Sequence, residues 1–168
     1  QNSKLSKHEL ERNSMAIQLV ISGCCGRMGS RIASLALSDS AFTVTGALEA
    51  RNHQAIGQDL GTLLDGKALG LRITDDVKAT LQSGDVLIEF TQPEATIEHV
   101  QVARQLKKPA VIGTTGLSEA QRAVILEAAT MIPIVLSPNM SVGVNLLFEL
   151  VELTAKRLGP NVDVEVVE

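Results

Sequence analysis

Short runs rich in Val, Ile and Leu alternate along the chain with longer segments that mix polar and apolar residues. The apolar runs are typical of strands buried on both faces, and the mixed segments have the length and period of amphipathic helices. Strands separated by single helices predict parallel pairing through right-handed crossovers. The predicted strands are 16–22, 42–49, 85–90, 109–114, 132–137 and 162–168.

Helices are predicted between these strands. One follows the first strand after a glycine-rich turn, and the others cover 74–81, 93–108, 117–130 and 141–159, with a loop at 50–72. Thr74 is the expected N-cap of the helix at 74–81. This order of elements predicts an α/β fold, a Rossmann-type parallel sheet with helices on both faces, over residues 15–139. Residues 1–14 are polar and are interpreted as a native extension or a cloning remnant.

The C-terminal residues 140–168 are predicted to be the first helix and strand of a second, incomplete domain. The strand at 162–168 alternates Val with acidic residues over most of its length, which predicts one apolar face. A strand that ends without a neighbour exposes an edge, so we expect self-association there.

Composition narrows the class of protein. The 168 residues are 45% hydrophobic with a mean hydropathy of +0.18, and they include no Trp, no Tyr and three Phe, so the core must be aliphatic. The net charge of -4 argues against nucleic acid as a partner. No apolar run approaches the roughly 20 residues of a membrane span, and no signal peptide is apparent. The two cysteines are adjacent, which provides no disulfide framework and favours a reducing cytoplasm.

Glycines recur every three residues directly after the first strand, at Gly23, Gly26 and Gly29. In the dinucleotide-binding fingerprint such glycines form the tight turn, let the backbone approach a pyrophosphate, and allow close packing of the helix on the strand. The helix that follows directs N–H groups and a positive dipole at the phosphates, and Arg27 adds a cation. A glycine-rich turn without a ligand is the alternative.

An acidic residue favours the interpretation of this turn as a dinucleotide-binding site. Glu49 ends the second strand twenty residues after Gly29, where a carboxylate can accept hydrogen bonds from ribose hydroxyls. The alternative for Glu49 is an exposed charge at a strand end. The two features together predict that 15–139 is a dinucleotide-binding domain. Glu49 favours NAD(H), because a 2′-phosphate would meet like charge, whereas Arg51 could pair with that phosphate or lie solvated in the loop.

Cys24 and Cys25 fill small-residue positions in the turn. A redox sensor is a second interpretation, because a helix N-terminus lowers the pKa of a thiol. Metal binding is less favoured, since His53 and His99 lack ligand-like spacing to these cysteines.

Four segments in this order resemble the dihydrodipicolinate reductase family: VISGCCGRMG, LIEFTQPEAT, VIGTTGLSEAQ and LSPNMSVGVN. The resemblance covers residues 16–168. It implies that NADH and/or NADPH reduces an unsaturated dicarboxylic heterocycle, 4-hydroxy-tetrahydrodipicolinate, to tetrahydrodipicolinate in lysine and diaminopimelate biosynthesis. It also implies a second, α+β domain that binds substrate and builds a homotetramer, to which the strand at 162–168 would belong.

The resemblance also implies roles for individual residues. Gly23, Cys24, Cys25, Gly26, Arg27 and Met28 would cradle the pyrophosphate, and Glu49 would bind the adenosine ribose. Phe90 and Thr91 would lie beside the nicotinamide half of the cofactor. Gly113, Thr114 and Thr115 would contact the nicotinamide ribose and border the substrate. Ser137, Pro138, Asn139 and Met140 would hold the carboxamide and form the hinge to the substrate domain.

The chain departs from the family pattern in two places. Many relatives have an arginine directly after the ribose acid, where this chain has Ala50, with Arg51 next. The family's signature His-His-x-x-Lys follows a strand resembling 162–168, and this sequence stops at Glu168. No catalytic residue is therefore predicted here, and we expect this chain to bind cofactor but to turn over little or no substrate. Another two-domain Rossmann oxidoreductase, or a regulatory NAD(H)-binding domain without chemistry, stays open.

Overall fold

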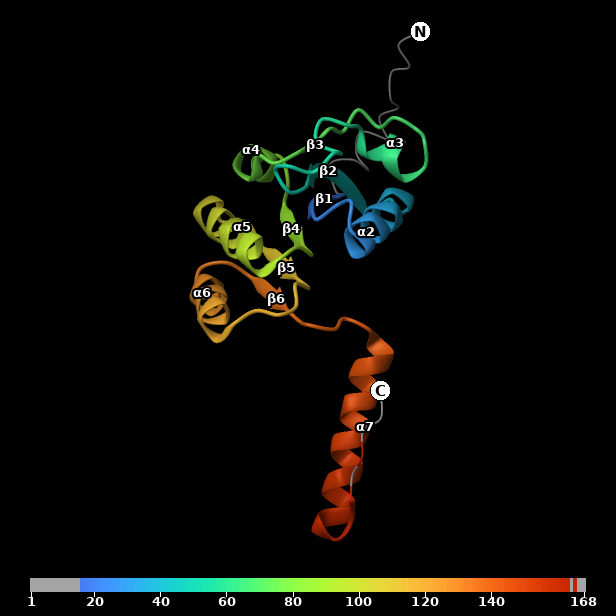
Figure 1. The fold of residues 1–168 in the computed structure, drawn as a ribbon, viewed down its shortest axis with the longest axis vertical. Helices are drawn as coiled ribbons and strands as arrows, with labels where there is room; N and C mark the ends of the chain where they lie inside the picture. The colour runs from blue at the N-terminus through green and yellow to red at the C-terminus, as the bar shows by residue number, and fades with distance from the viewer. Residues whose placement is uncertain (1–15, 164, 166–168) are drawn as a thin grey trace. The chain divides into compact units, whose positions relative to one another are not determined.

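A computed structural model describes residues 16–163 and 165, and divides the chain into two compact units, one up to Leu136 and one from Ser137. The first unit contains a six-stranded sheet in the order β3-β2-β1-β4-β5-β6, with every pair parallel (Figure 1). The strands are β1 (Ile17–Ser22), β2 (Phe42–Leu48), β3 (Ile73–Thr74), β4 (Val86–Glu89), β5 (Ala110–Ile112) and β6 (Ile134–Leu136). The helices of this unit are α2 (Arg27–Ser38), α3 (Leu60–Leu64), α4 (Val77–Gln82), α5 (Pro93–Leu106) and α6 (Glu119–Ala129).

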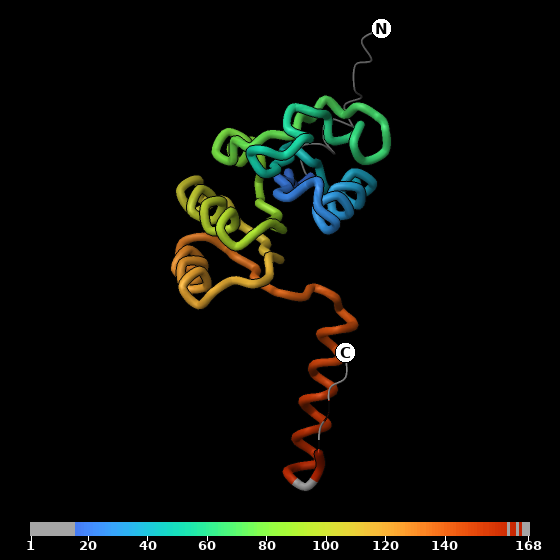
Figure 2. The backbone as a smooth tube through the Cα atoms, viewed as in Figure 1, coloured from blue at the N-terminus to red at the C-terminus, as the bar shows by residue number. Residues whose placement is uncertain are grey.

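Two aliphatic clusters form the core, one on each face of the sheet. On one face, α4, α5 and α6 pack on the strands through residues such as Leu81, Val100 and Ile125. On the other face, α2 and α3 pack through residues such as Ala33 and Leu60. The tube trace in Figure 2 follows the chain back and forth across the sheet. The predicted Rossmann-type sheet, with helices on both faces, is confirmed.

The strand order reverses between β1 and β4, because the chain continues outward through β2 and β3 and then returns to the other side of β1. In such sheets the loops that follow the strands separate at this switch point and leave a crevice for a ligand. The site described below lies at this edge.

Local hydrogen bonds moved several predicted boundaries. The helix predicted to start at Thr74 starts at Val77 instead, because the Asp76 carboxylate accepts from the N–H of Ala79 (2.9 Å) and caps it, while Thr74 belongs to β3. The predicted loop at 50–72 contains α3, whose cap is Asp59. Hydrogen bonds from the N–H groups of Leu69 and Thr62 lower the pKa of that aspartate.

The second unit contains one long helix, α7 (Val142–Leu158), followed by the short 3-10 helix η1 (Gly159–Asn161). The Ser141 hydroxyl accepts from the N–H of Val144 and caps α7, so the predicted helix at 141–159 is confirmed within a residue at each end. The strand predicted at 162–168 and the extension at 1–14 lie largely or wholly outside the described residues. Among the described residues, none of the helices has the length and apolar character that a bilayer crossing requires.

Candidate functional site

The chain leaves β1 through a turn that requires glycine. Gly23 has a φ of 73°, in the left-handed region, and a Cβ on it would lie 2.3 Å from the carbonyl oxygen of Phe90. A Cβ on Gly29, in the first turn of α2, would lie 2.0 Å from the carbonyl oxygen of Gly23. The tight turn at Gly23 and the close helix packing at Gly29 are therefore confirmed, and α2 begins directly against the end of the sheet.

Most N–H groups of this turn are already hydrogen-bonded. Gly23 and Cys24 donate to Leu48 O (3.0 and 3.2 Å), Cys25 donates to Glu49 Oε2 (3.0 Å), and Gly26 donates to Gly23 O (2.9 Å). The N–H groups of Arg27 and Met28, in the first turn of α2, have no acceptor among the described residues. Because a helix N-terminus also carries positive potential, these two groups and the neighbouring N–H of Gly29, which also has no acceptor among the described residues, are donors that an anionic ligand would find.

Glu49 directly follows β2, and two backbone groups orient its carboxylate. Oε2 accepts from the N–H of Cys25 (3.0 Å), and Oε1 accepts from the N–H of Ala50 (2.9 Å). Each oxygen keeps a further lone pair, so the carboxylate can accept from a diol without losing these contacts. Arg51 lies beside it with its side chain 85% exposed, and its Nε donates to Asp75 Oδ2 (3.1 Å).

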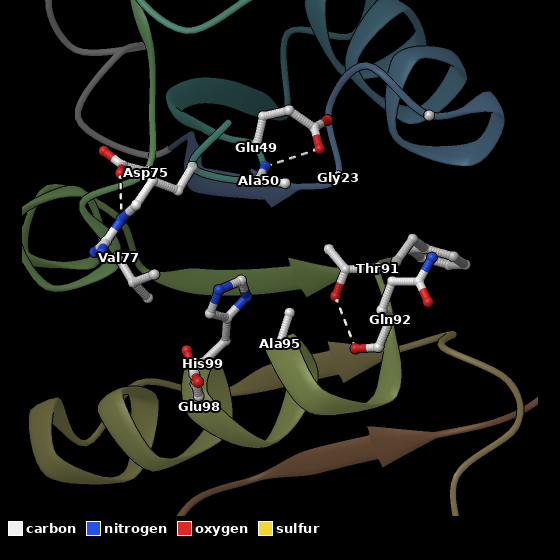
Figure 3. A pocket seen from close by; sticks show the side chains of 13 residues that line it. Gly23, Glu49, Ala50, Asp75, Val77, Thr91, Gln92, Ala95, Glu98 and His99 are labelled. Carbon is white, nitrogen blue, oxygen red and sulfur yellow. Dashed lines mark hydrogen bonds and ion pairs between the residues drawn. The ribbon is translucent and has the colours of Figure 1, made fainter. Parts of the chain in front are cut away.

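The glycine turn and Glu49 border a pocket of about 830 Å³ at the carboxyl edge of the sheet. In Figure 3, Glu49 and Ala50 lie on one side of the pocket, and Ala95, Glu98 and His99 of α5 lie on the opposite side. The loops after β1, β2, β3 and β4 all contribute. The lining residues are Gly23, Gly26, Glu49, Ala50, Arg51, Asp75, Val77, Phe90, Thr91, Gln92, Ala95, Glu98 and His99.

A buried polar cluster lies beneath one wall of this pocket. Glu89, the last residue of β4, is fully buried, and its Oε2 lies 2.8 Å from Nδ1 of His99. Its Oε1 accepts from the Thr91 hydroxyl and lies 3.3 Å from the Thr96 hydroxyl. Ser22, at the end of β1, places its hydroxyl 3.1 Å from the same His99 nitrogen. The carboxylate thus joins the ends of two strands to α5.

This cluster was not predicted from the sequence. A signal for Glu89 was present, since a carboxylate inside an otherwise apolar strand must find partners when it is buried. The α5 residues of the pocket also share one helix face, because Ala95, Glu98 and His99 are spaced i, i+3 and i+4.

With this geometry in hand, comparison with known proteins decides the family. A family model described as dihydrodipicolinate reductase, N-terminus, matches residues 17–140, most of the chain. This chain belongs to the dihydrodipicolinate reductase family. Two relatives named 4-hydroxy-tetrahydrodipicolinate reductase, from Anaeromyxobacter dehalogenans strain 2CP-1 and from Geobacter sulfurreducens, are each 44% identical over 151 residues. Each alignment covers 90% of this chain and 56% of the relative, so the chain spans a little over half the length of these reductases.

A solved structure shares the fold. Dipicolinate-bound dihydrodipicolinate reductase from Paenisporosarcina sp. TG-14 superposes with a TM-score of 0.66 at 22% identity, over 83% of this chain and 54% of that one. The six-stranded parallel sheet is thus the fold of the N-terminal part of this reductase family.

The residues predicted for the nicotinamide half lie where β4 and β5 end. A Cβ on Gly113 would lie 2.0 Å from the Phe90 ring, so this glycine leaves room for that ring. The Thr114 hydroxyl is buried and accepts from the N–H of Thr91 (3.1 Å) and from the Thr96 hydroxyl (2.8 Å). Thr114 therefore links two loops, while Thr115 is exposed. Their contacts with a cofactor stay a prediction.

The pKa values of the two cysteine thiols do not fit the redox-sensor interpretation. Burial raises the pKa of Cys24, which is fully buried, and burial is also the largest cause that raises the pKa of Cys25. The expectation of a lowered thiol pKa is wrong, because loss of hydration outweighs the dipole of α2 at this place. The thiols and the Glu49 carboxylate lie within 4.8 Å of one another, but neutral thiols are poor metal ligands and this carboxylate already accepts two N–H groups.

The predicted carboxamide and hinge residues belong to the second unit. The Ser137 hydroxyl donates to the carbonyl oxygen of Asn139 (2.7 Å), and Asn139 Oδ1 accepts from the N–H of Ser141 (2.9 Å), just before α7. Pro138 and Met140 lie in the same segment, between Ser137 and Ser141. Their part in cofactor binding and in a hinge stays a prediction.

Proposed function

We propose that this chain is the cofactor-binding part of a 4-hydroxy-tetrahydrodipicolinate reductase, which uses NADH or NADPH to reduce an unsaturated dicarboxylic heterocycle. The observation that carries the proposal is the pocket lined both by Gly23 and Gly26 of the turn that leads into α2 and by Glu49, whose carboxylate is oriented by two backbone N–H groups. The names of the relatives, of which the alignment covers 56%, supply the reaction.

The residues present fit a nicotinamide dinucleotide. Within the described part of the chain, a Cβ on Gly26 would meet Gly23 O at 3.2 Å and no other atom within 4 Å, so the backbone surface at this residue is otherwise open. A pyrophosphate there would accept from the N–H groups of Arg27 and Met28, and the adjoining ribose diol would donate to Glu49. The cofactor supplies the hydride of the reduction. The described residues bind and orient it, and we assign no catalytic acid or base among them.

We infer that this pocket prefers NADH to NADPH. A 2′-phosphate would lie against the Glu49 carboxylate, and Arg51, the arginine that lines the described pocket, already pairs with Asp75. The arginine would have to exchange this partner for the phosphate, which reduces its net contribution. A cytoplasmic location and a homotetramer stay predictions from the family.

Titration of the 168-residue chain with NADH and with NADPH tests the proposal. We expect both to bind, NADH more tightly. Glu49→Gln should weaken the binding of NADH by at least about tenfold, which corresponds to one lost charge-assisted hydrogen bond. It should also reduce or reverse the preference of the chain for NADH over NADPH. Glu98→Gln is the matched control, because it removes the same charge from the opposite wall of the pocket. Absence of binding to the folded chain, or equal effects of the two variants, would overturn this assignment.

A further inference from the structure

The buried carboxylate of Glu89 determines which nitrogen of His99 carries a hydrogen. The contact of 2.8 Å between Oε2 and Nδ1 requires one hydrogen between the two atoms, and an ionised carboxylate, which can only accept, places that hydrogen on Nδ1. The other carboxylate oxygen accepts from the Thr91 hydroxyl, which holds Glu89 in this orientation. In the neutral ring, the lone pair is then on Nε2.

The Nε2 atom faces the pocket. No described residue forms a hydrogen bond with it, and among the described residues no buried side-chain nitrogen or oxygen lacks a partner. Nε2 must therefore be accessible, although the His99 side chain is only 13% exposed, and this residue lines the pocket. A hydrogen-bond acceptor thus opens into a site whose neighbouring walls, Val77 and Ala95, are apolar (Figure 3).

The position of this acceptor relative to Glu49 indicates the ligand group that it meets. If the ribose lies on Glu49 and the phosphates lie at the start of α2, the base must extend from the ribose into the rest of the pocket, between Val77 and α5. This step depends on the proposed function. Flat apolar walls suit the faces of a purine, and an acceptor between them suits a donor on the edge of that purine.

We propose that His99 Nε2 accepts a hydrogen bond from the exocyclic amino group of adenine, and that Glu89 is the positioning residue that keeps Nε2 an acceptor. The pocket therefore selects an adenine dinucleotide over one that carries hypoxanthine. Hypoxanthine has an oxygen where adenine has the amino group, so two acceptors would face each other.

The test compares NADH with reduced nicotinamide hypoxanthine dinucleotide by titration of the full chain at one mildly alkaline pH. The parent chain should prefer NADH by about tenfold, since the lost hydrogen bond leaves two facing acceptors unpaired. His99→Asn keeps an amide N–H for Glu89 but has no atom at the Nε2 position, so it should lose the preference while the melting temperature stays close to that of the parent. Gln101→Ala, on an exposed position of α5, is the control and should keep the preference.

A second measurement tests the positioning role of Glu89. The nitrogen chemical shifts of His99 should report a neutral ring with its hydrogen on Nδ1, and Glu89→Gln should change that state and reduce the preference. An imidazolium, or a hydrogen on Nε2, would overturn the proposal, as would equal binding of the two dinucleotides to the parent chain. If the folded chain binds neither, the proposed function fails as well. If it binds both equally, only the role of His99 fails.

Discussion

Replacing Gly29 with alanine tests whether close packing of α2 on the glycine turn determines the stability of the sheet edge. The new Cβ would lie 2.0 Å from Gly23 O, 2.7 Å from Gly23 C and 2.9 Å from the Cα of Cys24. All three are backbone atoms, so no side chain can rotate away. Since carbon contacts are optimal at about 3.5–4.0 Å, α2 must move away from the turn by about 1 Å or more.

The magnitude follows from two opposed effects. In an exposed helix, replacement of glycine with alanine stabilises by roughly 1 kcal/mol. Here the overpacking costs about 3 kcal/mol, the upper end of the usual range, because both sides of the contact are backbone and the buried Ala33 and Ala36 move with the helix. The net result is a loss of about 2 kcal/mol, which corresponds to a melting temperature lower by about 5–10 °C.

Urea and thermal unfolding followed by circular dichroism measure this loss. Ser34→Ala is the control, because Ser34 lies on the exposed side of the same helix and its change adds no contact; we expect a difference within about 0.5 kcal/mol. NADH affinity should also fall in the Gly29 variant, since the N–H groups of Arg27 and Met28 move with α2. A Gly29→Ala chain as stable as the parent would refute the reasoning.

Two further predictions concern stability. Burial raises the pKa of the Cys24 thiol above its ordinary value of 9.0, so above pH 9.0 the unfolded chain loses this proton while the folded chain keeps it. The free energy of unfolding should therefore fall as pH rises past 9.0, by up to about 1.4 kcal/mol per pH unit. Urea unfolding at about pH 8 and about pH 10 should show a smaller fall for Cys24→Ala, and equal falls would contradict the raised pKa. Ser118 caps α6 and forms a capping box with Gln121, so Ser118→Ala should cost about 1 kcal/mol, whereas Ser118→Asp should restore most of it.

The boundaries of the elements show how far local sequence signals reach. The helix at 74–81 was predicted from Thr74 as its N-cap. In the structure Thr74 belongs to β3 and pairs with Leu48 of β2, and Asp76 caps α4. Both residues have cap-forming side chains, so propensity alone could not choose between them. Strand pairing with β2 made the choice, which is a contact between residues distant in the sequence.

The sequence by itself determined the alternation of the five longer strands of the sheet with helices, their parallel pairing, and the glycines of the turn, because these depend on periodicity and on backbone conformations that only glycine adopts readily, whereas the short β3 and α3 were missed. The position of Glu49 was likewise set by its distance from that turn. Only the tertiary structure decided which N–H groups stay open, since the carboxylate of Glu49 occupies that of Cys25. It also brought Glu89 and His99 together. Such contacts depend on where strand ends and a helix face meet in space, which no local pattern specifies.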